Sequence, residues 1–352
     1  WVTNNSQVFI GKLNKPINQL DGRARVPGAG QLDLDVLQDG SDVIGRDRAN
    51  GSAFVMDPSQ VLYPDRGGVG LPASWILAAQ AGTVAAIDPA TGALRASHVE
   101  GTQLPDVSAL DAEAKPLTKV GAESNVAVLA NGDIVAISAA ADTLTRVAAS
   151  ATGLSRPKTS ELSHTLGRVS QLTTVGESFA AFDDSAGKLI INDDLEVAVP
   201  KGAILQQASK SGEQVLFADG SQLSGVDLES GDVVQLADVP GGQAPSQPAQ
   251  IKQCSYGVWG GAWAQVVTAC RGSNPRVSQI ANGATDPVFR ITRGQIVLND
   301  RVSGAVWNID SENPVQVADW QALTPPKRKR DTKDTKTNQD VDMIKPKAEN
   351  DE

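Results

Sequence analysis

The stretch that decides the fold reads Trp75-Ile-Leu-Ala-Ala-Gln80, then Gly82-Thr-Val-Ala-Ala-Ile-Asp-Pro-Ala-Thr-Gly92, then Leu94-Arg-Ala-Ser-His98. Short apolar runs alternate with turns of Gly, Asp and Pro, which predicts a strand, a tight turn, a strand ending in Asp, a second turn and a third strand. The stretches 214–238 and 295–319 repeat this plan. Repetition of one antiparallel unit along the chain indicates an all-β fold.

The turn residues support the hairpins. Asn131-Gly132 and Asp219-Gly220 are pairs that accept the positive φ angles of type I′ turns. Asp88-Pro89 begins a turn that closes with Gly92, as expected where Pro occupies the first central position.

Eight hairpin starts can be placed, near residues 1, 42, 75, 125, 178, 214, 254 and 295. Successive starts lie 33 to 53 residues apart, which brackets the repeat of about 40–45 residues of a β-propeller blade. We predict an all-β protein, a β-propeller of seven or eight four-stranded blades over residues 1–324. The number depends on whether the first and last fragments complete one shared blade. A Leu-rich solenoid is the weaker alternative because its repeat is only about 20–29 residues.

Residues 325–352 have a different composition and almost no apolar side chains. Such a segment cannot offset an ordering entropy of about 1–2 kcal/mol per residue, so we predict a flexible hydrophilic linker to downstream domains absent from this sequence. Its basic run Lys327-Arg-Lys-Arg330 could contact an anionic surface or nucleic acid or act as a targeting patch. A solvated linker run is the simpler interpretation.

Composition excludes several classes of protein. Of the 352 residues, 40% are hydrophobic and 20% charged, which excludes wholesale disorder and a membrane-embedded bundle. The net charge of -10 opposes nucleic-acid binding by the whole surface. No apolar run is long enough to span a bilayer. The chain begins at Trp1 without an initiator Met, so we expect a trimmed or mature fragment.

Cys254 and Cys270 are the sharpest local signal. The Gly-rich sequence 260–263 lies midway between them, so folding a hairpin there brings the two thiols opposite each other, at an expected Cα separation of about 5.5 Å. We predict a cross-hairpin disulfide and therefore an oxidising compartment. The alternative is two unrelated buried thiols.

Few residues offer catalytic or metal-binding chemistry. Two neighbouring turns carry Asp183-Asp184 and Asp193-Asp194, which could form a calcium site or a carboxylate pair for glycoside hydrolysis; capping of tight turns is the simpler interpretation. His98 and His164 are the only histidines and fit surface or core positions better than a catalytic base. The sequence contains no nucleophile elbow, Walker A loop, dinucleotide fingerprint or zinc-protease motif.

Tryptophans occur at or within the expected inner hairpins. A Trp at the rim of a propeller could stack on a sugar, but packing between blades is the commoner role. The residues concerned are Trp1, Trp75, Trp259 and Trp307.

Several of these features together resemble one family. Trp1-Val-Thr-Asn4 resembles the Tyr-Val-Thr-Asn signature of a bacterial propeller class, and the element Ile87–Gly92 matches its strand and turn. With 32–42, the cysteine hairpin and the ending 347–352, the chain resembles the N-terminal propeller of large actinobacterial membrane-anchored surface proteins. The resemblance implies a YVTN/PQQ-like propeller outside the cytoplasm, an N-terminal membrane helix and downstream tandem Ig-like or fibronectin type III domains. Some such proteins are associated with carbohydrate metabolism.

These observations lead to expectations about function. We expect an extracytoplasmic, non-enzymatic propeller that binds a protein or a cell-wall glycan, or acts as a scaffold, at the cell envelope. We expect no cofactor, no metal and no nucleic-acid partner, and membrane contact only through a segment outside this sequence. The alternatives are a glycosidase-type propeller with paired carboxylates at the channel mouth and a purely structural spacer.

Overall fold

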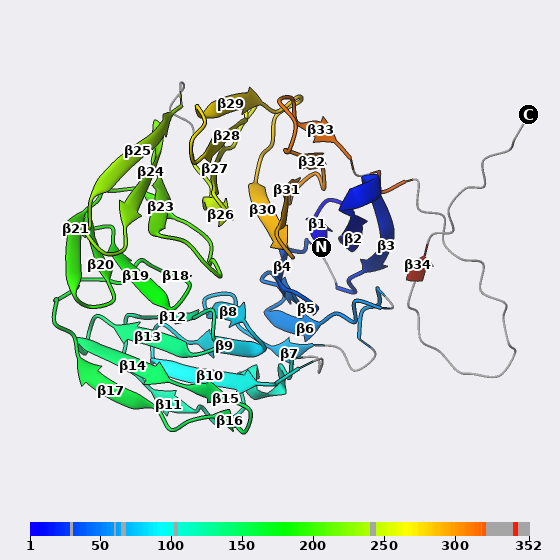
Figure 1. Ribbon diagram of the computed structural model, residues 1–352. Coiled ribbons are helices and arrows are strands. Elements are labelled where there is room, and N and C mark those ends of the chain that lie inside the picture. Colours follow the sequence, from blue (N-terminus) through cyan, green and yellow to red (C-terminus); the bar gives the residue numbers. More distant parts are fainter. Residues whose placement is uncertain are drawn as a thin grey trace, which may run out of the picture.

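The chain forms eight four-stranded antiparallel sheets arranged as blades around a central axis (Figure 1). This computed structural model describes residues 1–28, 31–59, 61–64, 68–101, 105–239, 244–317, 319–321 and 341–343. No helix in these ranges is long and apolar enough to cross a membrane. The arrangement of the sheets around one axis confirms the predicted β-propeller.

The first four sheets follow chain order from the N-terminus. The first contains β1 (Val2–Asn4), β2 (Phe9–Asn14), β3 (Gln19–Arg25) and β34 (Val341–Met343). The second contains β4 (Leu34–Asp39), β5 (Asp42–Asp47), β6 (Ser52–Val55) and β7 (Val69–Gly70). The third contains β8 (Ile76–Gln80), β9 (Thr83–Ile87), β10 (Ala93–His98) and β11 (Thr118–Lys119). The fourth contains β12 (Ser124–Val128), β13 (Ile134–Ser138), β14 (Thr143–Val147) and β17 (Lys158–Glu161).

The other four sheets complete the ring. The fifth contains β18 (Gln171–Val175), β19 (Ser178–Asp183), β20 (Lys188–Ile191) and β21 (Leu195–Ala198). The sixth contains β22 (Ile204–Leu205), β23 (Gln214–Ala218), β24 (Gln222–Asp227) and β25 (Val233–Asp238). The seventh contains β26 (Ala249–Ile251), β27 (Cys254–Trp259), β28 (Gln265–Cys270) and β29 (Arg276–Gln279). The eighth contains β30 (Pro287–Thr292), β31 (Gln295–Asp300), β32 (Val306–Asn308) and β33 (Val315–Gln316).

Short elements lie in the connections between strands of the same blade. They are the ribbon of β15 (Ala149–Ser150) with β16 (Gly153–Leu154), and two 3₁₀ turns, η1 (Lys15–Ile17) and η2 (Ser108–Leu110).

The first and last fragments do not share a blade, since β1 and β30 belong to separate sheets, so the ring has eight blades; β34 joins the first of them by pairing with β3. Gly22 lies opposite Met343 and Ala24 opposite Val341, so residues from the two ends of the chain share the first sheet. The strand β34 falls within the segment 325–352, for which we predicted a linker. The rest of that segment, including the basic run at 327–330, lies outside the described residues.

The core lies between neighbouring blades. Every residue of β9 and of β13 is buried, because these second strands are covered on both faces by adjacent sheets. Between the fifth and sixth sheets, Phe182 and Phe217 meet in one apolar cluster. Burying a side chain of this size contributes roughly 1.5–3 kcal/mol, so each sheet depends on its neighbours for stability.

Among the described residues, seven sheets supply a strand to the innermost ring, and β1 of the first sheet lies farther from the axis, against β31 and β4 (Figure 1). The amides of Asn5 and Ser6 donate to the carbonyls of Arg301 and Val302, so the end of β1 meets the turn that follows β31. The strand β1 therefore runs beside β31, a second strand, while β30 and β4 contact each other directly at the axis (Figure 1).

Arg290 on β30 spans the place where an innermost strand of the first sheet would lie. Its guanidinium forms an ion pair with Asp35 at 2.8 Å and donates to the carbonyl of Val36 at 2.9 Å and to Oγ1 of Thr3 at 3.3 Å. Asn299 accepts the amide of Thr3 and donates to its carbonyl, which fixes β1 against β31. Side chains thus join the eighth, first and second sheets.

Arg290 is buried at this junction, and the side chain of Asp35 is 18% exposed. Burial alone would raise the pKa of Asp35, but the guanidinium groups of Arg290, Arg301 and Arg48 outweigh burial and lower that pKa. Arg301 is also held by Asp286, with a nitrogen-to-oxygen distance of 2.7 Å. Asp35 is therefore a largely buried carboxylate whose charge depends on its arginine partners.

Candidate functional site

A polar pocket of about 360 Å³ opens on one end face of the ring, where the first and second strands of neighbouring blades are joined. Turns of the second, third and fourth sheets form it, together with the chain that follows β10 and β14. Its polar side chains include two carboxylates of one turn, a third carboxylate, a histidine and an asparagine. These residues are Asp39, Asp42, Glu100, His98 and Asn131.

The wall at the third sheet is built by a tight turn. Ala81 and Gly82 both have positive φ, 50° and 73°, as a two-residue type I′ hairpin requires. A Cβ at Gly82 would lie 2.2 Å from the carbonyl oxygen of Val99, so only glycine fits there. The strained Ala81 is held by its amide, which donates to Oδ2 of Asp39 at 2.7 Å. The turn of the second sheet thus fixes the turn of the third.

Asp39 and Asp42 lie directly opposite each other on β4 and β5. Asp39 forms an ion pair with Lys210 of the sixth sheet, with Nζ to Oδ1 at 2.5 Å. Burial raises the pKa of Asp42, and the neighbouring charge of Asp39 raises it further. The pocket therefore contains one carboxylate with a cationic partner and one that binds its proton more tightly than usual.

His98 is held in one tautomer. Its Nδ1 lies 2.8 Å from Oγ1 of Thr83, and that hydroxyl donates its single proton to the carbonyl of Gly132 at 2.7 Å. The Thr83 oxygen must therefore accept from His98, so Nδ1 carries the proton and Nε2 is the acceptor. The fourth sheet is tied to the third through this relay.

Replacing Asp42 with asparagine is expected to raise the free energy of unfolding at pH 7 by up to about 0.5 kcal/mol, the small effect of a partly solvated site. Because the pKa of Asp42 in the folded protein lies above its ordinary value of 3.8, ionisation destabilises the fold as the pH rises through that range. The gain should therefore disappear near pH 3.5. Urea unfolding at both pH values measures it.

Asp227→Asn is the matched control. Amide donors of Ser230 and Glu229 lower the pKa of Asp227, so its replacement should destabilise the protein at pH 7. Equal effects of the two substitutions would contradict the assignment.

A second hollow of about 460 Å³ lies between the seventh, eighth and first sheets. Lys15 and Asp310 at its wall form an ion pair at 2.6 Å. Lys252, Tyr256 and Cys254 line it as well. Its charges are paired or exposed at the rim, so it offers a less convergent polar set than the first pocket.

Three of the four aspartates singled out in the sequence, Asp183, Asp184 and Asp193, accept backbone amides. Asp183 accepts the amides of Gly167 and Ala186 at 2.8 and 3.1 Å, and Asp184 accepts the amide of Gly202. Burial would raise the pKa of Asp183, but the bonds from Ser185 and from three amides outweigh burial and lower it.

In the second pair, the carboxylate of Asp193 accepts a backbone amide, whereas Asp194 is contacted at its main-chain carbonyl. Asp193 accepts the amide of Ser163 at 2.9 and 3.0 Å, and His164 contacts the carbonyl of Asp194. These bonds hold the aspartates in separate turns and do not bring the two pairs into one site. Within the described parts of the chain, no three His, Cys, Asp or Glu side chains converge to hold a metal ion.

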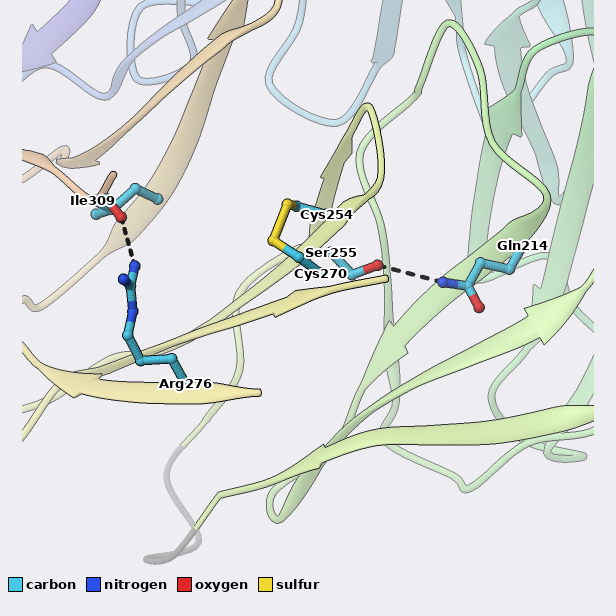
Figure 2. The surroundings of a disulfide bond; sticks show 6 residues. All are labelled: Gln214, Cys254, Ser255, Cys270, Arg276 and Ile309. Carbon is cyan, nitrogen blue, oxygen red and sulfur yellow. Dashed lines mark hydrogen bonds between the residues drawn. A yellow bond between two sulfur atoms is a disulfide. The ribbon is translucent and has the colours of Figure 1, made fainter. Parts of the chain in front are cut away.

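The structure contains the disulfide between Cys254 and Cys270 (Figure 2). Their Cα atoms are 4.0 Å apart, closer than the expected 5.5 Å. The neighbouring pair is hydrogen-bonded, since the amide of Arg271 donates to Gln253, so the cysteines occupy a non-hydrogen-bonded position, where opposite Cα atoms approach to about 4.5 Å.

The blade that carries the disulfide is tied to both neighbours. Gln214 of the sixth sheet donates to Oγ of Ser255, and Arg276 donates to the carbonyl of Ile309 in the eighth sheet (Figure 2). The bridge therefore fixes a hairpin that is already held on both sides.

Three of the four tryptophans considered for sugar stacking pack in the core instead. Trp259, Trp307 and Trp75 are only 1%, 2% and 8% exposed. Arg95 stacks on Trp75 with a distance of 4.6 Å to the ring centroid. The exposed aromatic is Trp263, in the turn between β27 and β28.

Sequence reasoning missed the pocket residues Asp39, Asp42 and Glu100. Residues 39–42 read Asp-Gly-Ser-Asp, an unusually acidic turn, and this was the available signal. Nothing in one turn indicates which other turns of the ring will stand beside it.

No family model and no curated protein matches the chain. Among solved structures, the dihydro-heme d1 dehydrogenase NirN is similar, with a TM-score of 0.56 and 13% identity over 90% of this chain and 72% of that chain. BamB from Moraxella catarrhalis gives 0.50 and 12% over 87% and 89%. Virginiamycin B lyase from Staphylococcus aureus gives 0.50 and 12% over 88% and 95%. These likenesses show the propeller fold alone.

Proposed function

We propose that this propeller is a non-enzymatic domain that works outside the cytoplasm, at the cell envelope, and binds a protein or a cell-wall glycan in the pocket formed by Asp39, Asp42 and Glu100. The observation that carries the proposal is the pocket itself, in which turns of three blades bring polar side chains together on one end face. A purely structural spacer has no need of such a set. The proposed role as an ectodomain is supported by the disulfide and by the family resemblance, not by the pocket.

The disulfide supports a location outside the cytoplasm, because such bonds persist in oxidising compartments. The family resemblance adds a membrane anchor and downstream Ig-like or fibronectin type III modules in the parent protein. These remain part of the proposal.

The use of the carboxylates favours binding over catalysis. Asp183, Asp193 and Asp227 each accept backbone amides in turns. These carboxylates therefore stabilise the fold. One observation favours the second candidate, a glycosidase-type propeller: Asp42 has a raised pKa and lies opposite Asp39 in a pocket. A raised pKa is what a general acid needs.

Titration of the purified protein against cell-wall glycan fragments, peptides and purified ectodomains tests the proposal. We expect a ligand whose affinity falls at least tenfold in Glu100→Gln, while the exposed-turn variant Glu229→Gln binds as the wild type does. A ligand that binds both variants equally well would place the contact elsewhere and overturn the assignment of the pocket. Hydrolysis of a polysaccharide that is abolished by Asp42→Asn would replace the proposal with the second candidate.

A further inference from the structure

The connection between β22 and β23 differs from the corresponding connections in other blades. It runs from Gln206 to Glu213, whereas the first and second strands of the third, fifth and eighth sheets are joined by two-residue turns, at 81–82, 176–177 and 293–294. In Figure 1 this green segment, next to β23 and β18, extends toward the centre of the ring. A connection of this length can leave its own blade.

The middle of this segment is fixed to the fifth sheet. The amide of Ser209 donates to the carbonyl of Thr174 at 2.8 Å, and the amide of Gly176 donates to the carbonyl of Ser209 at 2.9 Å. Val175 and Ser209 form a parallel bridge. Lys210 therefore begins beside the end of β18.

From that position Lys210 reaches the opposite side of the axis. The innermost strands follow the order β4, β8, β12, β18, β22, β26 and β30, so β18 and β4 face each other across the ring (Figure 1). The ammonium nitrogen lies 2.5 Å from Oδ1 of Asp39, which ends β4. The side chain of Asp39 is 13% exposed and that of Lys210 is 63% exposed.

We propose that residues 206–213 form a strap across the axial opening, held on its far side by the ion pair of Lys210 with Asp39. Breaking this pair releases Lys210 and leaves Asp39 in the pocket without its cation, beside Asp42. The position of the strap over the axis is thereby coupled to the charge of Asp39 in the pocket. This inference rests on geometry and does not depend on what the pocket binds.

An exposed pair of this kind contributes little and is screened by salt, which suits a contact that must open. The middle of the strap, at Ser209, is held by backbone bonds to the fifth sheet, which are not sensitive to charge. Release should therefore be confined to Lys210 and the residues that follow it.

Trypsin cleavage after Lys210 tests the strap, because the protease needs a lysine that is free to enter its active site. Asp39→Asn removes the charge, while its amide oxygen can still accept the Ala81 amide. We expect cleavage at Lys210 to become about two- to fivefold faster, and cleavage at the exposed Lys201 to stay unchanged. In the wild type, 1 M NaCl should raise the Lys210 rate to that of Asp39→Asn, whose own rate should not respond.

Asp88→Asn is the matched control, because Asp88 likewise accepts a turn amide, that of Ala90, but has no ion pair among the described residues. Equal Lys210 cleavage in the wild type and Asp39→Asn would overturn the proposal. A second variant, Lys210→Met, covers the case in which Asp39→Asn does not fold. Hydrogen exchange should then be two- to fivefold faster at the Ser211 amide, which donates to Oγ of Ser209, and unchanged at the amides of β19; unchanged exchange at Ser211 would also refute the strap.

Discussion

Arg290→Met is expected to lower the free energy of unfolding by about 3–5 kcal/mol, the effect of removing one partner of a buried ion pair. Arg290 is 7% exposed and is the group nearest to Asp35. Its loss leaves the largely buried carboxylate of Asp35 and the acceptor of Val36 unpaired in the second sheet, and removes a donor to Thr3 in the first. Urea unfolding at pH 7 measures the change.

Two variants separate charge from packing. The exposed Arg168→Met should change stability by no more than about 0.5 kcal/mol. The double variant Asp35→Asn with Arg290→Met should recover part of the loss, because no buried charge remains. A loss below about 1 kcal/mol in Arg290→Met would mean that Arg301 and Arg48 suffice for Asp35 and that Arg290 does not close the ring.

The pH dependence gives an independent check. The pKa of Asp35 in the folded protein is lowered below its ordinary value of 3.8. Its contribution to stability is therefore present above pH 3.8 and is lost as the pH falls through the folded-state pKa. The Asp35→Asn variant should lack this part of the acid destabilisation.

The double substitution Cys254→Ala with Cys270→Ala is expected to cost about 3 kcal/mol, the value for a bridge that spans a sequence separation of 16. The cross-link restricts the unfolded chain, so reduction of the wild type should give the same loss. Denaturant unfolding with and without reductant measures both. The variant Ser255→Ala keeps the bridge and loses only the 3.4 Å contact with Gln214, so it should remain close to the wild type. Identical midpoints for oxidised and reduced protein would show that the bridge does not stabilise the hairpin.

The sequence predicted the hairpins because turn chemistry is local. Pairs such as Asn131-Gly132 and the Gly-rich turn after Trp259 mark reversals whatever surrounds them. Position within a blade was harder to predict. The starts near 75 and 125 coincide with innermost strands, whereas those near 42, 178, 214, 254 and 295 coincide with second strands. Innermost strands such as β22 and β26 are too short to show a two-residue alternation.

The candidate site could be predicted only in part. Asp39 and Asp42 are close because one hairpin register places them opposite each other. Asp39 also contacts Ala81 in the next blade and Lys210 in a blade far along the sequence, and no spacing encodes which blades face each other. The disulfide was predictable because both cysteines belong to one hairpin.

The position of β1, farther from the axis than β30 and β4, bears on how the molecule would come apart. The strands β30 and β4 of the eighth and second sheets already contact each other at the axis, so the first sheet is not needed for that contact. The first sheet packs on the outer side of the β30–β4 contact. We therefore expect local unfolding to begin in the first sheet, while the other sheets stay folded.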